Sequence, residues 1–407
     1  MTEFTIRRLG HHGDGIADGP LFAPVTLPGE VVTGRVSGQT LEDIRIITPS
    51  SERVAPPCRH FKACGGCALQ HASDAFVADW KVDVVRNALD AHGLETEFRP
   101  IITSPAQSRR RATFAARRTK KGAMAGFYGR GSDVIIEIPD CQLLHPDLMA
   151  GLNVAEELAM AGASRKAALA VTVTLSENGL DVAVTVGKPL DGPLRLTLGQ
   201  LCEKLGLARI AWEDEVIAMR LPPLQRFGRA EVLPPPGAFI QATADGEAAL
   251  LAAVREAVGE ASHVADLFSG CGTFALPLAE TASVHAVEGE AEMLTALDQG
   301  WRKAEGLKPV TTEARDLFRR PLLPDEMKGL EAIVLDPPRA GAERQVVEIC
   351  KAGVPRIAFV SCNPVTFARD AQALCDAGYT LDWVQVVDQF RWSAHVELAA
   401  SFTQIAG

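Results

Sequence analysis

The first residue able to do chemistry is a cysteine between a predicted strand and a predicted helix. Cys362 follows the apolar run 356–360 and precedes Asn363-Pro364, and a proline suits the first turn of a helix. In an open α/β sheet, the carboxyl end of a strand faces the crevice that binds ligands. A thiol there can act as a nucleophile, because part of it is thiolate at neutral pH. An isolated free cysteine is more often a small buried apolar residue, so this interpretation depends on the rest of the chain.

Three further cysteines lie close together in the sequence and predict a metal centre. Cys58, Cys64 and Cys67 fall within ten residues, and Gly65-Gly66 permits tight backbone turns between the last two. A fourth ligand is needed, and Cys141 is the candidate farther along the chain. Zinc is one alternative, because four-cysteine zinc sites are common, although five residues between Cys58 and Cys64 exceed the usual spacing.

Acidic residues and a glycine turn indicate a binding site for an adenosine group. An apolar strand ending near Asp266 runs into a turn with Gly270 and Gly272, whose small size lets a ligand approach the backbone. Glu288 ends the next strand, 22 residues after Asp266, and a carboxylate there can accept hydrogen bonds from both ribose hydroxyls. The sequence has no Gly-Lys-Ser/Thr phosphate loop. An adenosine ligand without phosphates fits best, which points to S-adenosylmethionine.

Two more acids follow later predicted strands. Asp316 is placed to reach the adenine amino group, and Asp336 opens the run 336–339, in which two prolines fix a rigid turn at the crevice. Amino-group methylases carry an aromatic residue where this chain has Arg339, which argues against methylation of nitrogen. The last strands, around 383–387 and 395–402, predict an antiparallel hairpin that contains His395-Val396-Glu397.

The elements that must position these residues divide the chain into three domains. Turn signals between short apolar runs predict a small β-barrel, of the oligonucleotide-binding or TRAM-like kind, over residues 1–52. Residues 53–235 predict a β-rich central domain, with a hairpin that turns near 178–179. Residues 236–407 predict an α/β domain of the Rossmann-like class. A helix is predicted over 73–91. Its apolar stripe, assigned to the core, consists of Phe76, Trp80, Val84, Val85 and Leu89.

One stretch reverses the acidity of the chain and predicts a surface for RNA. The formal net charge is −10, yet residues 95–131 hold nine Lys or Arg residues against two Glu. Phe114, Phe127 and Tyr128 are interleaved with them. Basic side chains neutralise phosphates and aromatic rings stack on unpaired bases. The alternative is a solvated basic face without a partner.

The composition is that of an ordinary globular protein. A length of 407 residues allows two or three domains. No segment approaches the ~18 consecutive apolar residues of a membrane span, and the first ten residues lack the apolar core of a secretory signal. Nine cysteines then favour metal or catalytic roles over disulfides. We expect a cytoplasmic protein with no membrane contact and no obligate protein partner.

These motifs together resemble those of the bacterial RNA uracil-5 methyltransferases, which make 5-methyluridine in large-subunit rRNA and tRNA. The resemblance covers nearly the whole chain. It rests on Cys58, Cys64, Gly65-Gly66-Cys67, Gln70-His71, Cys141, Phe239-Ile240-Gln241, Asp266 to Gly272, Asp336-Pro337-Pro338-Arg339, Ser361-Cys362-Asn363-Pro364 and His395-Val396-Glu397. It implies an S-adenosylmethionine-dependent catalytic domain, an N-terminal RNA-binding barrel, and a central domain whose four cysteines hold a [4Fe-4S] cluster.

The resemblance also implies roles for single residues. Residues lining the S-adenosylmethionine site would be Gln241, Phe268, Gly270, Gly272, Thr273, Glu288, Asp316 and Asp336. Relatives often have Asn in place of Thr273 and Pro in place of Arg391, so this chain departs from the pattern there. Cys362 would attack C6 of a flipped-out uracil, and Glu397 would remove the C5 proton after methyl transfer.

The residues also bear on the alternatives to this function. The substrate implied is a uridine of 23S rRNA, with a tRNA uridine as the alternative. Cytosine-5 methylases use a Pro-Cys nucleophile, whereas Ser361 precedes Cys362 here. Radical methylation requires an iron without a cysteine ligand, and Cys141 would fill that place. A non-catalytic iron-sulfur module that binds RNA and senses S-adenosylmethionine would leave the pair of Cys362 and Glu397 without a role.

Overall fold

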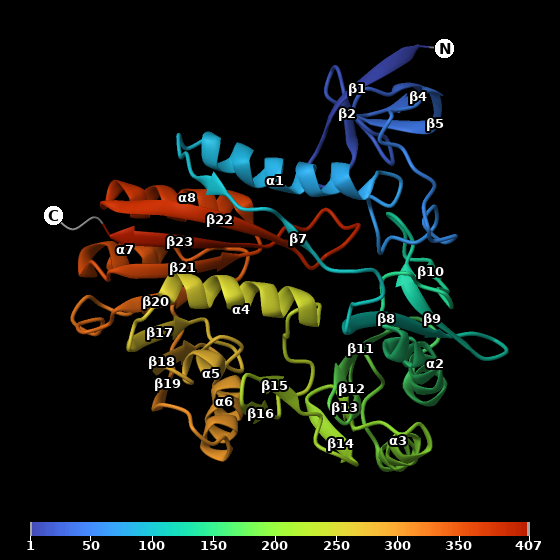
Figure 1. Ribbon diagram of the computed structural model, residues 1–407. Coiled ribbons are helices and arrows are strands. Elements are labelled where there is room, and N and C mark those ends of the chain that lie inside the picture. Colours follow the sequence, from blue (N-terminus) through green and yellow to red (C-terminus); the bar gives the residue numbers. More distant parts are fainter. Residues whose placement is uncertain (1, 405–407) are drawn as a thin grey trace.

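The computed structural model describes residues 2–404, and its N-terminal part closes into a five-stranded barrel (Figure 1). The strands are β1 (Glu3–Leu9), β2 (Gly15–Ala17), β3 (Leu21–Ala23), β4 (Val31–Ser37) and β5 (Thr40–Thr48). Small and branched apolar side chains, among them Ile6, Val32 and Leu41, fill the interior. The buried carboxylate of Glu30 forms a 2.5 Å ion pair with Arg53, which ties the end of the barrel to the next segment. The predicted barrel is confirmed.

The central domain is a seven-stranded sheet covered by two helices. Its strand order is β10-β9-β8-β11-β12-β13-β14. The strands are β8 (Arg111–Arg118), β9 (Ala123–Tyr128), β10 (Ile135–Ile136), β11 (Leu169–Ser176), β12 (Gly179–Thr185), β13 (Arg209–Trp212) and β14 (Glu215–Met219). Helix α2 (Ala150–Gly162) follows a short 3-10 turn (Pro146–Met149), and helix α3 (Gly192–Lys204) follows β12. Both helices bury their apolar faces against the sheet. The predicted hairpin is confirmed as β11–β12, in register from Ala170 opposite Thr185 to Ser176 opposite Gly179.

The C-terminal domain is a nine-stranded, mostly parallel sheet with helices on both faces. Its strand order is β19-β18-β17-β20-β21-β23-β22-β6, and β7 also pairs with β22. The core strands are β17 (His263–Leu267), β18 (Ser283–Glu288), β19 (Val310–Ala314), β20 (Ala332–Leu335), β21 (Arg356–Ser361), β22 (Tyr379–Asp388) and β23 (Leu398–Gln404). One face packs on α4 (Ala244–Val258), α5 (Ala275–Leu278) and α6 (Ala291–Lys303), and the other on α7 (Glu343–Ala352) and α8 (Pro364–Asp376). The predicted α/β architecture is confirmed.

The loop before β23 differs slightly from the expectation. The antiparallel hairpin of β22 and β23 is present, but His395-Val396-Glu397 lies just before β23 and not within a strand. A short hairpin of β15 (Gln225–Phe227) and β16 (Ala230–Val232) connects the central sheet to this domain and packs on α6. No helix among residues 2–404 has the length and apolarity needed to cross a membrane.

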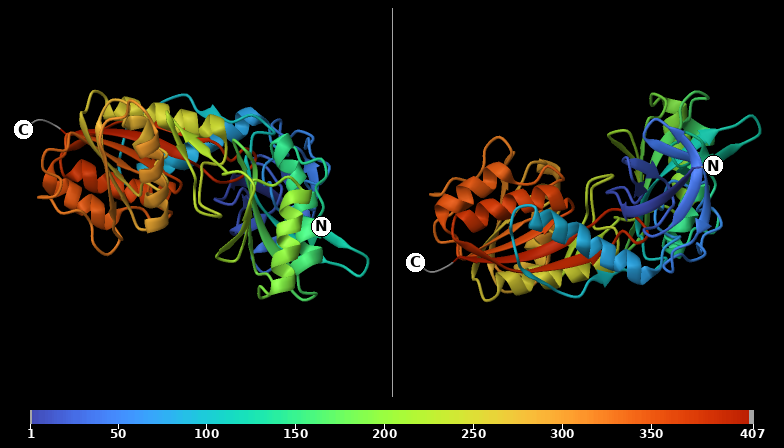
Figure 2. Two further views of the ribbon diagram at one scale, coloured as in Figure 1. Left: turned by 90° about the horizontal axis from the view of Figure 1, so that it is seen from below. Right: turned by 90° about the horizontal axis from the view of Figure 1, so that it is seen from above.

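The segment between the barrel and the central sheet belongs structurally to the C-terminal sheet. Helix α1 (Asp74–Asp90) packs on α8 and β22, and the short strands β6 (Glu97–Phe98) and β7 (Ile102–Thr103) pair with β22. Seen from above, α1 runs across the C-terminal domain towards the barrel (Figure 2). The sequence placed residues 74–103 in the central domain. The order of the chain did not indicate this, because β22 pairs with the short strand β6, which lies nearly 300 residues upstream.

Candidate active site

The carboxyl ends of adjacent parallel strands bring the predicted acids to one edge of the C-terminal sheet. Asp266 lies in β17, Glu288 ends β18 and Asp336 follows β20. Backbone amides hold Glu288 on both sides, because its Oε2 accepts from Gly270 at 3.0 Å and its Oε1 from Gly289 at 2.6 Å. The glycine turn after β17 therefore fixes the direction of this carboxylate.

These acids oppose one another's ionisation. Asp266 is fully buried and neither of its carboxyl oxygens has a hydrogen-bond partner of normal geometry within residues 2–404. Burial, and then the charge of Asp336, raise the pKa of Asp266 well above its ordinary value. Burial and the charge of Glu288 raise the pKa of Asp336 to about 7. The edge thus holds an excess of acidic groups, which a cationic ligand would offset.

The turn after β17 adopts backbone conformations that favour glycine. The φ angle is +54° at Gly270 and +95° at Gly272, where a Cβ atom would come within 2.8 Å of Leu276. Phe268 has a φ of +63°, which is uncommon for a residue with a Cβ atom. Its ring packs against Phe318 with the centroids 5.4 Å apart. The turn places an aromatic ring beside a backbone that a ligand can approach closely.

The remaining predicted cofactor residues surround the same edge. Asp316 follows β19, is exposed, and uses Oδ1 to accept the amide of Phe318 at 3.0 Å. Gln241 is buried before α4, and its Oε1 accepts a 2.6 Å hydrogen bond from Gln389. Thr273 is half-buried ahead of α5. Their contacts with a cofactor stay predictions.

Cys362 lies at the junction of β21 and α8, as the sequence predicts. Asn363 caps α8 by accepting the amide of Val365 at 3.1 Å, and its Nδ2 donates to the carbonyl of Arg339 at 2.9 Å. The cap fixes the backbone beside the half-buried thiol. Burial first, and then the charges of Glu397 and Asp336, raise the pKa of Cys362 to about 11, while Arg339 opposes the shift.

Glu397 lies directly opposite Cys362. Ser361 of β21 pairs with Leu398 of β23 in antiparallel register. Cys362, which follows Ser361, and Glu397, which precedes Leu398, therefore meet at the same end of the sheet. The carboxylate is buried and accepts a 3.3 Å hydrogen bond from Gln389. Burial and the charge of Asp336 raise the pKa of Glu397 to about 8. The structure therefore brings the predicted nucleophile and the predicted base together.

His395, two residues before Glu397, is neutral and lines the same cavity as Cys362. The Arg339 guanidinium contacts Nδ1 of His395 at 2.5 Å. Because a guanidinium only donates, Nδ1 must accept, and the imidazole is neutral in this arrangement. Burial and the charge of Arg339 accordingly lower the pKa of His395.

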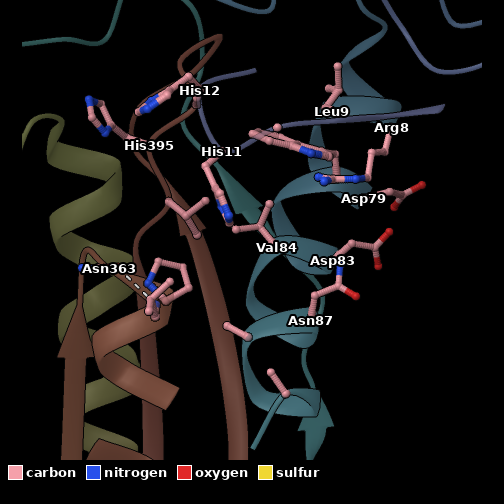
Figure 3. A pocket seen from close by; sticks show the side chains of 18 of the residues that line it. Arg8, Leu9, His11, His12, Asp79, Asp83, Val84, Asn87, Asn363 and His395 are labelled. Atoms are coloured by element: carbon pink, nitrogen blue, oxygen red, sulfur yellow. Dashed lines mark hydrogen bonds between the residues drawn. The ribbon is translucent and has the colours of Figure 1, made fainter. Parts of the chain in front are cut away.

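Cys362 is one of the residues that line a cavity of about 1080 Å³. Figure 3 shows part of this cavity, with Asn363 and His395 among the labelled residues. Three parts of the chain form its walls. The barrel contributes Arg7, Arg8, Leu9, Gly10, His11, His12 and Pro28. Helix α1 contributes Phe76, Asp79, Trp80, Asp83, Val84, Asn87 and Ala88, and the residues after it contribute Ala91 and His92. The catalytic edge contributes Arg339, Cys362, Asn363, Pro364, Val365, Ala394, His395 and Val396.

The apolar stripe of α1 is only partly core, which corrects the sequence interpretation. The residues buried against the sheet and the barrel are Val77, Lys81, Val85 and Leu89. Phe76, Trp80 and Val84 are half-exposed and line the cavity. The wide apolar face of this helix meets two environments, because half of it covers the sheet and the other half faces the gap beneath the barrel.

The basic run at 95–131 is largely structural, which weakens the prediction of an RNA face there. Arg110 pairs with Glu247 and Arg99 pairs with Glu256. Arg111 donates to the carbonyl of Gly237 at 3.0 Å. Phe114, predicted to stack on bases, is fully buried. Of the basic residues in this run, Lys120 and Lys121, at the tip of the β8–β9 hairpin, are fully exposed. Local sequence cannot show that a distant carboxylate neutralises a cation.

The four predicted metal ligands lie in one neighbourhood. The charges of Cys141, Cys64 and Cys58 all contribute, after burial, to raising the pKa of Cys67 to about 12. All four thiols are free. Within residues 2–404, however, no three Cys, His, Asp or Glu side chains converge closely enough to hold a single metal ion. The cysteines are thus neighbours without forming a closed mononuclear site, and their role as cluster ligands stays a prediction.

Sequence analysis missed two polar residues that organise the site. Lys81 occupies a core position of α1 and forms a 2.5 Å ion pair with Asp388, at the end of β22. Gln389, the next residue, contacts both Gln241 and Glu397. A signal for Lys81 was available, because it falls four residues after Val77 and four before Val85 in the buried row.

Comparisons with known proteins agree with this geometry. The sequence profile described as tRNA (Uracil-5-)-methyltransferase matches residues 229–404. An RNA methyltransferase of Brucella suis is 44% identical over 405 residues, covering 99% of this chain and 98% of that protein. The 23S rRNA (uracil(1939)-C(5))-methyltransferase of a Shewanella strain is 30% identical, covering 98% and 95%. The solved structure of Pyrococcus abyssi tRNA (uracil-54, C5)-methyltransferase with S-adenosyl-L-homocysteine has a TM-score of 0.77 at 23% identity, covering 98% and 99%.

Proposed function

This chain belongs to the RNA (uracil-5-)-methyltransferase family, and we propose that it transfers a methyl group from S-adenosylmethionine to C5 of a uridine in RNA. One observation carries the proposal. Cys362 lines a large cavity, and the buried Glu397 lies opposite it across the ends of β21 and β23, beside an acidic edge suited to a cationic cofactor.

The acidic edge fits S-adenosylmethionine by charge and by hydrogen-bonding capacity. The cofactor is a sulfonium cation and would supply an electrophilic methyl group. We place that charge beside Asp336 and Glu288. Among residues 2–404, Asp266 adds a buried carboxyl with no hydrogen-bond partner of normal geometry. Gly270 leaves room at the backbone for the ligand, and Phe268 offers a ring for the adenine.

Cys362 would activate the uracil. Its thiolate forms a bond to C6, and the electrons of the C5=C6 double bond move towards O4 as an enolate. C5 then becomes nucleophilic enough to take the methyl group, while the sulfonium bond breaks and its electron pair stays on sulfur. The high pKa of Cys362 means that the thiol is mostly protonated before the reaction partners bind. A bound cation near Asp336 would remove part of that obstacle.

Glu397 would complete the reaction. After methyl transfer C5 carries both a methyl group and a proton, and the ionised carboxylate accepts the proton. The electrons of the C5–H bond re-form C5=C6 and expel the Cys362 thiolate. Because the pKa of Glu397 is about 8, its basic form becomes dominant only in mildly alkaline solution unless the bound cofactor lowers this value.

The cavity offers a route for the RNA. Arg8, His11 and His12 on the barrel side can approach phosphates, whereas Asp79 and Asp83 on α1 repel them (Figure 3). Trp80 on the same helix presents an aromatic surface on which a base can stack. We therefore propose that the backbone follows the barrel and that the unstacked bases face α1 and Cys362.

A [4Fe-4S] cluster is our proposal for the four-cysteine neighbourhood. A mononuclear zinc ion needs donors that converge on one point, and among residues 2–404 no three side chains do so. A four-iron cluster binds each thiolate to a separate iron, so its ligands stand farther apart while remaining neighbours. We propose Cys58, Cys64, Cys67 and Cys141 as its ligands, in a structural role.

The test is methyl transfer from labelled S-adenosylmethionine to separate rRNA and tRNA fractions, followed by nucleoside mass spectrometry. We propose 23S rRNA as the substrate because the rRNA-modifying relative aligns along the whole chain. 5-Methyluridine in large-subunit rRNA supports both claims, and the same nucleoside in tRNA keeps the reaction while replacing the substrate. Binding of the cofactor without any 5-methyluridine would leave the non-catalytic, cofactor-sensing module as the better account.

A further inference from the structure

We propose that Gln389 is a positioning residue that joins the cofactor-side glutamine, Gln241, to the base, Glu397, and favours the proton-accepting form of its carboxylate. The inference rests on the proposed methyl transfer and deepens it. Gln389 does not touch the cavity in front of Cys362, so it would act through its neighbours.

The hydrogen bonds of Gln389 fix the orientation of its amide. The backbone amide of Ala242 donates to Oε1 of Gln389 at 2.8 Å, so the other end of the amide must be the nitrogen. Nε2 donates to Oε1 of Gln241 at 2.6 Å and to Oε2 of Glu397 at 3.3 Å. The amide has two N–H donors and both are used. A flipped amide would lose all three contacts.

Close packing prevents the side chain from moving away. Gln389 is 1% exposed. A Cβ atom built on Gly246 in the first turn of α4 would lie 2.5 Å from the Cβ of Gln389, so the helix backbone presses directly on it. Asp388 fixes the backbone next to Gln389, because its carboxylate accepts hydrogen bonds from both Lys81 Nζ and the backbone amide of Phe390. The bridge is therefore rigid.

The hydrogen bond from Gln389 to Glu397 partly offsets the neighbouring groups that oppose ionisation of Glu397. The charged and titratable groups around Glu397 are Asp336 and Arg339 after β20, Cys362 after β21, His395 on its own loop, and the Lys81–Asp388 pair behind that loop. Burial and Asp336 favour the protonated carboxyl, whereas the N–H of Gln389 and the charge of Arg339 favour the carboxylate. Within residues 2–404, Gln389 supplies the hydrogen bond that the carboxylate accepts.

The bridge also couples two halves of the reaction. Because Oε1 of Gln241 accepts from Gln389, Nε2 of Gln241 is the group that would donate to a bound cofactor. Loss of Gln389 would free Gln241 to rotate and would raise the pKa of Glu397. Binding of the cofactor and removal of the C5 proton should then suffer together.

The test compares Gln389→Met with the wild-type protein across pH. One hydrogen bond to a charged group corresponds to a shift of roughly one pKa unit or a tenfold effect. We expect the acidic limb of the rate profile to move up by about one pH unit and the covalent RNA adduct to accumulate about tenfold below that limb. Affinity for S-adenosylhomocysteine should fall several-fold in the same variant.

Two further variants keep the test decisive. Gln345→Met removes an equally buried glutamine in α7 that bonds to Leu322, away from the site, and should leave the profile unchanged. Gln389→Glu keeps the size of the side chain but replaces the N–H donor with a carboxylate. It should shift the acidic limb of the pH–rate profile at least as far as Gln389→Met does. An unshifted profile in folded Gln389→Met and Gln389→Glu proteins overturns the inference, whereas absence of 5-methyluridine from wild-type protein overturns the proposed function instead.

Discussion

The carboxylate of Glu397 and the thiol of Cys362 meet across the ends of β23 and β21, and the charge of the first opposes ionisation of the second. A nucleophile next to its own base is usually activated by it. Here Cys362 would act in the attack on C6 and Glu397 in the later removal of the C5 proton. Both groups must be ionised to act, although their charges repel each other. The thiol should therefore be unreactive until the negative charge at this edge is offset.

The pH dependence of Cys362 alkylation follows from this relationship. The pKa of the thiol is raised to about 11, so the thiolate is scarce at neutral pH and its reaction with iodoacetamide should accelerate as pH rises towards that value. Asp336→Asn removes one opposing charge and should raise the alkylation rate at fixed pH. Peptide-level mass spectrometry measures the rate, with half-buried Cys350 as an internal reference. An unchanged rate in Asp336→Asn would contradict the electrostatic cause.

Substitution of the two catalytic candidates should separate the two steps. Cys362→Ala should abolish both methylation and the covalent RNA adduct, because no other residue attacks C6. Glu397→Gln keeps the nucleophile but loses the base, so methylated RNA should remain attached to the protein. Denaturing gels with labelled RNA distinguish the two results. A methylating Cys362→Ala protein would show that the covalent mechanism is wrong.

The sequence revealed those parts of the site that lie at the ends of strands. Cys362, Asp336 and Glu288 each follow an apolar run, and parallel strands necessarily bring such positions to one edge. The hydrogen bonds of Gln389 could not be predicted from the sequence. Gln389 and Gln241 are 148 residues apart in the chain, and no local pattern indicates their contact. Arg110 and Arg111 were predicted to face RNA for the same reason, since their carboxylate and carbonyl partners lie on other segments.

Helix α1 should contribute to RNA binding through Trp80. Trp80→Ala removes the ring from the cavity wall and should raise the KM for RNA at least about fivefold, since stacking on one base is worth about 1–3 kcal/mol. The KM for S-adenosylmethionine should stay the same. Trp80→Phe retains an aromatic face and should recover most of the affinity. Equal losses in Trp80→Ala and Trp80→Phe would indicate a packing role instead.

The buried ion pair between Lys81 and Asp388 should stabilise the loop that carries Glu397. Both side chains are at most 2% exposed, and Lys81 also donates to the carbonyl of Phe390 at 3.1 Å. Lys81→Met leaves a buried carboxylate without its cation and should lower the free energy of unfolding by about 3–5 kcal/mol. Urea unfolding measures this loss, and methylation should fall as the loop relaxes.

A double variant and a surface control complete this test. Lys81→Met combined with Asp388→Leu removes both charges, so it should recover part of the stability that Lys81→Met loses, because no unpaired charge remains buried. Arg86→Met breaks an exposed ion pair with Asp83 on the same helix and should cost less than about 1 kcal/mol. If the double variant were less stable than Lys81→Met by the full amount again, the hydrogen bonds of Asp388 to the loop, and not its pairing with Lys81, would be the dominant contribution.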